Sequence, residues 1–258
     1  MIFPIRKTHA NCIVMKKISI ICMKWGTVYG PEYVNILHAM VKRHLSLEHD
    51  FICFTDDRTG INKDIECRDL PDIKLGSAPN FAGWRKISTL SPDLGIEGTI
   101  LFLDLDLIIT GSIDFLFDYK PGSFCIIENW SQMNQMTGNS SVYRYESDAH
   151  NDIFEHFNND CEDVYANYKS SQLYMTRKVA EKHKVEFWPD KWVRSFKRHC
   201  IPNRFFRYFI KPKLPAECSI LVFHGPPKPL EAAVGQWENK GKIRKLLPSP
   251  WILDHWKE

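Results

Sequence analysis

The chain has 258 residues, of which 44% are hydrophobic and 25% are charged, and its formal net charge is only +3. A chain of this size and composition can bury one sizeable core, and its near-balanced charge excludes bulk nucleic-acid binding and a largely disordered chain. The eight cysteines form no close pairs and several lie in apolar runs, which predicts reduced, buried thiols in a cytoplasmic protein rather than a disulfide framework or a zinc ribbon.

Residues 1–17 are predicted to be an N-terminal extension outside the fold. No apolar stretch approaches the roughly 20 residues that span a bilayer. The N-terminus also lacks the sustained apolar segment and small-residue cleavage site of a signal peptide. Because Met15-Lys16-Lys17 directly precedes the first strand-like run, a single folded domain is expected over 18–258.

The first elements of this domain alternate between strand and helix. Ile18–Lys24 predicts a buried strand, and Pro31, a residue favoured at the first position of a helix, is followed by apolar residues at helical spacing up to Leu45. Phe51–Thr55 predicts a second strand and Ile65–Leu70 a third. This order favours an α/β fold that binds its ligands at the carboxyl ends of the strands.

Two acids, Asp104 and Asp106, interrupt the apolar run Thr99–Thr110, which follows a helix predicted over Trp84–Leu90. Alternate residues of a strand share a face, so both carboxylates are expected on the same side. Two neighbouring buried carboxylates require a cation, and the run contains no Lys or Arg. We therefore predict a divalent metal ion, which would also bind substrate phosphates. The alternative is that both acids lie beyond the strand end and are solvated.

The second half of the chain continues the pattern of strands and helices. Strands are predicted at Phe124–Glu128, Ser141–Tyr145 and Ser219–His224, and helices near Asn151–Phe157 and over Ser171–Lys182.

Residues 191–216 form a basic aromatic segment, with eight Lys or Arg residues and no acid. Such a mixture suits the surface of an anionic membrane, where each basic residue contributes about 1 kcal/mol. We expect this segment to hold a cytoplasmic protein against the inner face of the membrane. The alternative is a loop whose rings cover the core while its cations face water.

Several short motifs, taken together and in this order, resemble nucleotide-sugar glycosyltransferases of the GT-A fold, and most closely the bacterial members of family 8. The motifs are Met23–Gly26, Tyr29–Tyr33, Cys53–Asp57, Trp84–Lys86, Asp104-Leu105-Asp106, Asn139–Ser141 and His224–Pro229. The resemblance extends from Ile18 to Glu231. It implies an α/β fold made of a single GT-A, Rossmann-like domain, in which helices flank a central mixed, mostly parallel sheet.

The resemblance also implies an activity. Such enzymes move a sugar, here of hexosyl type, from a nucleoside-diphosphate sugar to a glycan or lipid-linked acceptor, as in cell-surface polysaccharide biosynthesis, and UDP is the favoured nucleotide. Their paired aspartates and a later histidine hold Mn²⁺ or Mg²⁺, which gives Asp104, Asp106 and His224 as metal ligands. This mixed donor set suits Mn²⁺. Nucleic acid is not an expected partner.

Other residues acquire roles from the same resemblance. The catalytic residues would be Asp106, Lys228 and Gln172, with Lys228 placing positive charge beside the leaving diphosphate. Contacts to the donor-sugar hydroxyls would come from Asn139, Ser140 and Gln172. The nucleotide would be bound by Lys24, Tyr29 (against the base), Thr55 and Asp56 (at the base edge), Lys86 (at the diphosphate), Asp104, Gly225 and Lys228.

Two positions depart from the family pattern. Ser171 stands where an acid usually precedes Gln172, and Leu230 stands where a tryptophan often follows the Lys-Pro pair. With no evident nucleophilic carboxylate, a retaining reaction would proceed by front-face transfer assisted by the diphosphate. Two alternatives stay open: a catalytically silent scaffold of the same fold that binds nucleotide or glycan, and a haloacid-dehalogenase-like phosphatase that uses Asp104 and Asp106.

Overall fold

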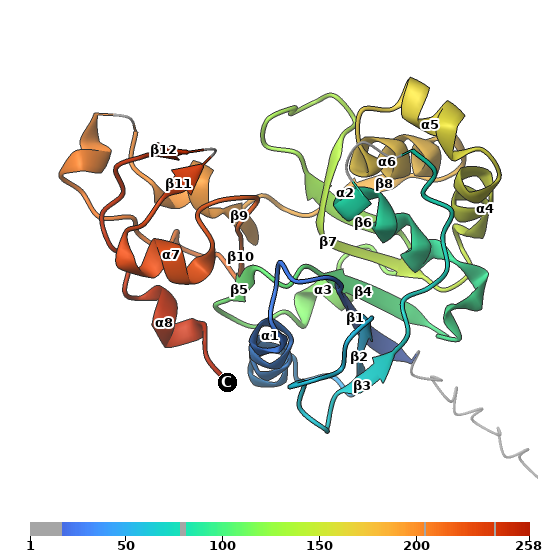
Figure 1. Cartoon of the computed structure of the whole chain (residues 1–258), viewed down its shortest axis with the longest axis horizontal. Helices are drawn as coiled ribbons and strands as arrows, with labels where there is room; N and C mark the ends of the chain where they lie inside the picture. The colour runs from blue at the N-terminus through green and yellow to red at the C-terminus, as the bar shows by residue number, and fades with distance from the viewer. Residues whose placement is uncertain (1–16, 78–80, 204, 240) are drawn as a thin grey trace, which may run out of the picture.

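A mixed seven-stranded sheet forms the centre of the computed structural model, which describes residues 17–77, 81–203, 205–239 and 241–258 (Figure 1). Its strands are β1 (Ile18–Lys24), β2 (Asp50–Thr55), β3 (Glu66–Arg68), β4 (Thr99–Leu103), β6 (Phe124–Glu128), β7 (Gly138–Glu146) and β8 (Val185–Phe187). They lie in the order β3-β2-β1-β4-β7-β6-β8. All neighbours are parallel except that β7 runs antiparallel to β4 and β6. The predicted α/β fold with a mostly parallel sheet is confirmed.

Each face of this sheet carries its own hydrophobic cluster. In β1, Ile20 and Cys22 belong to one cluster and Ile21 and Met23 to the other, as the alternation of side chains along a strand requires. Helix α1 (Pro31–His44) packs on the first face through four buried apolar side chains. The second face is covered by the 3₁₀ helix η1 (Arg85–Leu90), α4 (Asn151–Asn159) and α6 (Ser171–Lys182).

A smaller sheet joins the C-terminal part of the chain to the centre. Its strands are β5 (Leu107–Ile109), β10 (Ile220–Val222) and β9 (Val193–Ser195), with β10 in the middle. The segment from β9 onward lies to the left in Figure 1, and α4 and α6 lie to the right. The other elements are α2 (Phe81–Trp84), η2 (Pro92–Leu94), α3 (Phe115–Asp118), α5 (Cys161–Asn167), η3 (Phe196–Cys200), η4 (Phe206–Tyr208), α7 (Pro229–Val234), β11 (Glu238–Asn239), β12 (Lys242–Ile243) and α8 (Ile252–His255).

The apolar run Thr99–Thr110 is not a single strand, and this part of the sequence prediction is wrong. β4 ends at Leu103 in the large sheet, and β5 begins at Leu107 in the small one. The two aspartates occupy the turn between the sheets, where Leu105 is buried in the core. The acids therefore lie directly beyond the carboxyl end of β4, at the place where the chain changes sheets.

Three further expectations concern the cysteines, membrane-spanning helices and the N-terminal extension. The seven cysteines in the described part of the chain are free, in agreement with the predicted reduced thiols. None of the helices described there is long and apolar enough to cross a bilayer. Of the predicted extension at residues 1–17, only Lys17 is described, and the rest lies outside the described residues.

Candidate functional site

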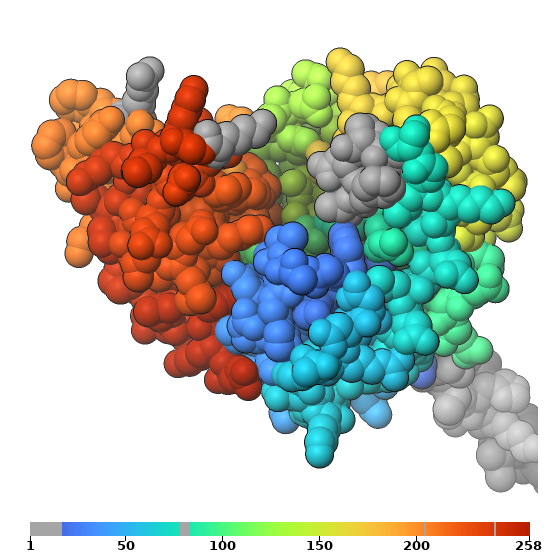
Figure 2. Space-filling model, in the orientation of Figure 1, coloured from blue at the N-terminus to red at the C-terminus, as the bar shows by residue number. Residues whose placement is uncertain are grey.

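A cavity of about 410 Å³ opens at the carboxyl ends of β1 and β4. This is the edge of an α/β sheet at which ligands generally bind. In Figure 2 the surface is hollowed above the blue N-terminal residues, between the orange-to-red C-terminal residues and the green ones. The predicted site residues that line the cavity are Tyr29, Lys86, Asp104, Asp106, Asn139, Ser140, Gln172, His224, Gly225 and Lys228. The fold therefore brings residues from six separate parts of the chain to one place.

Asp106 is the most enclosed charged group of this cavity. Its Oδ2 accepts hydrogen bonds from the Tyr29 hydroxyl at 2.7 Å and from the Lys228 ammonium at 2.6 Å. Lys228 also contacts the Tyr29 hydroxyl and lies 4.4 Å from the centre of the Tyr29 ring. Burial and the charge of Asp104 raise the pKa of Asp106, against the opposing effect of Lys228 and Tyr29. The lysine thus supplies a cation for this buried carboxylate.

Asp104 has its own lysine. The Lys86 ammonium lies 2.6 Å from Asp104 Oδ1 and donates a second hydrogen bond to the Ser140 carbonyl at 3.2 Å. The backbone N–H of Asp104 donates to the Ser141 carbonyl at 2.9 Å, which fixes the turn against β7. Lys86 therefore lies beside the aspartate pair and lines the cavity. Its contact with a diphosphate stays a prediction.

The residues predicted to contact the donor sugar lie on facing elements. Asn139 and Ser140 belong to β7, and Gln172 lies in the first turn of α6. The Ser140 N–H donates to Gln172 Oε1 at 3.4 Å, so the two elements meet at the cavity wall. Ser171, which replaces the expected acid, is buried there beside Gly83. As a result, the only carboxylates among the described residues of the cavity lining are Asp104 and Asp106.

His224 follows β10 and faces the end of the neighbouring strand β9. Its Nε2 shares a 2.7 Å hydrogen bond with the Ser195 hydroxyl, and its ring stacks on Trp130 at 5.8 Å between ring centres. Burial, with the nearby positive charges of Lys197 and Arg198, lowers the pKa of His224 to about 4, so the imidazole is neutral at physiological pH. Sequence reasoning missed Ser195, because only the pairing of β9 with β10 brings it to the histidine.

The fit of a divalent cation can be judged from these contacts. Two carboxylates and a neutral imidazole line one cavity, and these donor types suit Mn²⁺. Among the residues described, however, no three His, Cys, Asp or Glu side chains gather closely enough to hold a metal ion. The three predicted ligands, Asp104, Asp106 and His224, instead contact Lys86, Lys228 and Ser195 respectively. The donor chemistry fits, whereas binding would require Lys228 to leave Asp106.

Three residues predicted to bind the nucleotide do not line the cavity. Lys24 is buried at the end of β1, and the Thr55 hydroxyl is engaged with the backbone of Asp57 at the end of β2. Asp56 accepts a 2.9 Å hydrogen bond from the Gly26 N–H, which ties it to the loop after β1. Apolar lining comes instead from Met23, Trp25 and Val28, which sequence reasoning did not assign to the site although two of them belong to a matched motif.

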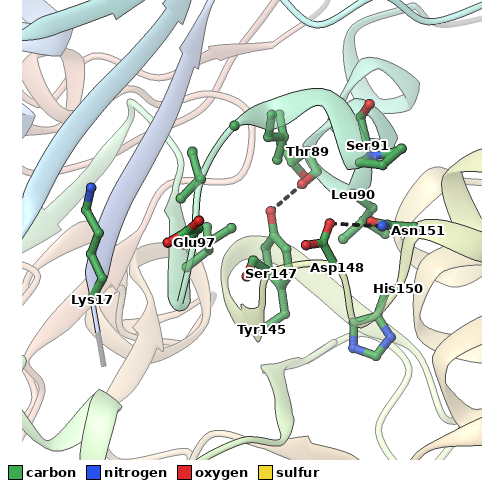
Figure 3. Close-up of a pocket in the computed structure, with 15 residues that line it drawn as sticks. Lys17, Thr89, Leu90, Ser91, Glu97, Tyr145, Ser147, Asp148, His150 and Asn151 are labelled. Carbon is green, nitrogen blue, oxygen red and sulfur yellow. Dashed lines mark hydrogen bonds between the residues drawn. The ribbon is translucent and has the colours of Figure 1, made fainter. Parts of the chain in front are cut away.

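A second cavity, of about 330 Å³, lies at the amino ends of β1 and β4. Figure 3 shows Tyr145 in this cavity with its hydroxyl directed at Thr89, while Asp148 contacts Asn151. It contains none of the predicted site residues. Since ligands of such folds bind at the opposite edge of the sheet, we assign the functional site to the first cavity.

His150, which lines the second cavity, makes the fold sensitive to acid. The ring is buried against Phe124 and His183, and burial lowers its pKa from 6.5 to about 4. As the pH falls through 6.5, His150 therefore becomes protonated in the unfolded chain but stays neutral in the folded chain. The free energy of unfolding is therefore unaffected by His150 above pH 6.5 and decreases as the pH falls toward 4. The decrease due to this one residue is about 2 kcal/mol at pH 5.

Urea unfolding at pH 7.5 and pH 5 of the wild type and of His150→Gln measures this effect. The variant should lose about 2 kcal/mol less stability between the two conditions than the wild type does. His49→Gln, at a half-buried histidine outside this cavity, serves as the control. Equal pH dependence in the wild type and His150→Gln would contradict the assignment.

Comparison with known proteins agrees with the assigned fold. No family model matches the sequence, and no curated protein sequence is significantly similar to it. Its fold is similar to that of the galactosyltransferase LgtC, solved in complex with donor and acceptor sugar analogs, with a TM-score of 0.57 at 12% identity over 82% of this chain and 88% of LgtC. The glycosyltransferase GlyE of Streptococcus pneumoniae TIGR4 gives a TM-score of 0.58 at 15% identity over 88% of this chain and 58% of GlyE. The bifunctional glycosyltransferase WbbM gives 0.57 at 10% identity over 85% of this chain and 48% of WbbM. These similarities confirm the predicted GT-A fold.

Proposed function

We propose that this protein is a glycosyltransferase that moves a sugar from a nucleoside-diphosphate sugar, with UDP favoured, to a glycan or lipid-linked acceptor. The observation that carries the proposal is the single cavity in which Asp104 and Asp106, each beside a lysine, face the polar residues of β7 and α6. The glycosyltransferase fold of the structural neighbours supports it. The same fold favours a transferase over the phosphatase alternative.

Each part of the cavity suits one part of such a donor. Lys228 and Lys86 can stabilise the negative charge that grows on the diphosphate as the bond to the anomeric carbon breaks. Asn139, Ser140 and Gln172 present amide and hydroxyl groups to the sugar hydroxyls. The apolar wall near Trp25 provides a surface for the base.

The proposal includes a divalent cation, Mn²⁺ or Mg²⁺, held by Asp104, Asp106 and His224. When bound it would supply Lewis-acid stabilisation of the leaving diphosphate. The neutral imidazole of His224 and the two carboxylates provide suitable donor atoms. Loss of transfer on chelation would support the cation, whereas full transfer in EDTA would mean that the lysines neutralise the diphosphate without it.

We propose that transfer retains the anomeric configuration by a front-face route. Of the described residues that line the cavity, the carboxylates are Asp104 and Asp106, and each is paired with a lysine. This leaves no free carboxylate to act as a nucleophile on the sugar. The departing diphosphate would then serve as the base that accepts the acceptor hydroxyl proton.

Turnover with a panel of nucleotide sugars tests the proposed activity. The full chain is incubated with UDP-, GDP- and CDP-sugars and Mn²⁺, and released nucleotide and new glycosides are followed by mass spectrometry. In parallel, thermal unfolding with each nucleotide measures binding, and about 100 Kd of a ligand should raise Tm by roughly 5 °C or more. Binding without turnover would indicate the silent scaffold, an outcome for which Ser171 is the motivating residue, and neither binding nor turnover would refute the proposal.

We also propose that the basic aromatic segment contacts an anionic membrane. Residues 205–210 expose a run of large apolar side chains, with Phe205 70% and Phe209 75% exposed. Arg207, Lys211 and Lys213 lie among or next to them, and Arg204 lies outside the described residues. Exposed rings flanked by cations match the chemistry of an anionic lipid surface.

Flotation with phosphatidylcholine vesicles, with and without phosphatidylglycerol, measures this contact. The wild type should float only with the anionic vesicles, and Phe205→Ser/Phe209→Ser should reduce the bound fraction severalfold. Leu253→Ser, which also replaces an exposed large apolar side chain with serine but lies in α8, should float as the wild type does. Failure of the wild type to float would leave the alternative of a loop whose cations face water.

A further inference from the structure

Lys197, in the basic aromatic segment, does not itself line the functional cavity but contacts the His224–Gly225 backbone that does. It lies in η3, and its ammonium donates a hydrogen bond to the backbone carbonyl of His224. The same ammonium is 3.8 Å from the point that a Cβ atom of Gly225 would occupy. Gly225 lines the cavity with a φ of +71°, a conformation that glycine adopts readily. With no side chain at Gly225, the ammonium stands directly behind the cavity wall.

This ammonium is a partly buried cation without an acidic partner. Among the described residues Lys197 forms no ion pair, and Asp106, whose charge acts on it, is paired with Lys228. Burial and the positive charges of Arg244, Lys228 and Arg198 lower the pKa of Lys197, against the attraction of Asp106. A partly buried, unpaired charge among like charges is unfavourable. An anion held at Gly225 would relieve this repulsion.

We propose that Lys197 is a further ligand of the donor's diphosphate, acting across Gly225 together with Lys228, and that it gives the site its preference for a diphosphate over a monophosphate. This inference rests on the proposed nucleotide-sugar transfer and assigns a new residue to it. Lys228 contacts Asp106 from inside the cavity, whereas Lys197 approaches from behind the loop. Two ammonium groups on different sides of one loop suit an anion with two phosphate groups.

Calorimetric titration of the full chain with a nucleoside diphosphate and its monophosphate tests the assignment. UDP, GDP and CDP are first compared on the wild type with Mn²⁺ present, and the tightest is used with its monophosphate. Lys197→Gln should weaken diphosphate binding about tenfold or more, as expected for a lost charge-assisted hydrogen bond, while monophosphate binding changes by less than about threefold. Lys197→Arg, which keeps the charge, should retain most of the preference. Lys257→Gln, an exposed lysine near the C-terminus, controls for the loss of one positive charge.

The outcomes separate this inference from the proposed function. A wild type that binds diphosphates no better than monophosphates overturns both. A wild type with the preference and a Lys197→Gln variant that keeps it overturns only the role of Lys197, as does an equal loss of both nucleotides. Thermal unfolding of the unliganded variants excludes misfolding, since removal of an unpaired, partly buried charge should leave Tm unchanged or raise it.

Discussion

Asp106→Asn is expected to lower the rate of sugar transfer at least about a hundredfold, the loss typical of removing one charged group from a preorganised catalytic site. Asparagine has nearly the same shape and can still accept the hydrogen bond from Tyr29. It cannot balance the charge of Lys228, which lies 2.6 Å away. The variant therefore leaves Lys228, the lysine proposed to face the leaving diphosphate, without its counter-charge, and it removes one proposed ligand of the cation. Initial rates with the best nucleotide sugar, measured across a Mn²⁺ series, record both effects.

The unfolding temperature of Asp106→Asn shows whether its loss of activity comes from misfolding. Because burial and Asp104 raise the pKa of Asp106, its negative charge is costly in the folded state at neutral pH. Asp106→Asn should therefore unfold at a temperature close to that of the wild type. Asp93→Asn, at an exposed acid of η2, provides the control and should keep full activity. Activity of Asp106→Asn within about threefold of the wild type would contradict the assigned role.

The position of the site at the carboxyl ends of the strands could be predicted from the sequence. Apolar runs of strand length alternate with helical spacing from Ile18 to Thr55, and that order already indicates a parallel sheet with its ligand edge. Asp104, His224 and Lys228 follow strands in the sequence, so the same edge collects them. The resemblance supplied their roles, and the cavity shows that the residues lie together.

The turn at the aspartate pair could not be predicted by pattern. Leu105 is buried and Leu107–Ile109 is apolar, so hydrophobicity continues across the point where the chain passes from one sheet to the other. Periodicity cannot separate one long strand from two short ones in such a run. Lys86 and Lys228 were predicted as site residues, but their pairing with the two aspartates was missed for a related reason. Lys228, the partner of Asp106, lies 122 residues away in the sequence, so the absence of Lys or Arg from the run itself was not informative.

One missed element did carry a local signal. Pro229 occupies the first position of α7, where proline is favoured, and Gly235 ends the helix in the left-handed conformation. The helix begins directly after Lys228, whose backbone N–H donates to Glu231 Oε2 at 2.8 Å. The cap fixes the backbone of Lys228, and this explains how the loop before α7 holds the ammonium in the cavity.

Lys228→Met is expected to lower kcat about a hundredfold while KM changes only severalfold. Methionine keeps the length and apolar stem of lysine but carries no charge, and the Glu231 cap on the backbone is unaffected. Because negative charge on the diphosphate grows as the bond to the sugar breaks, an ammonium beside it stabilises the transition state more than the bound donor. Steady-state rates over a donor concentration series separate the two parameters.

Rescue and control variants then decide how Lys228 acts. Lys228→Arg restores the charge and should recover part of kcat, whereas Lys42→Met, at an exposed lysine of α1, should behave as the wild type. If Lys228→Met raises KM with kcat unchanged, the lysine binds the ground state and transition state equally, and its catalytic role is refuted. If transfer in Lys228→Met also ceases to respond to Mn²⁺, the lysine and the cation depend on each other, as expected when both act on the same pair of phosphates.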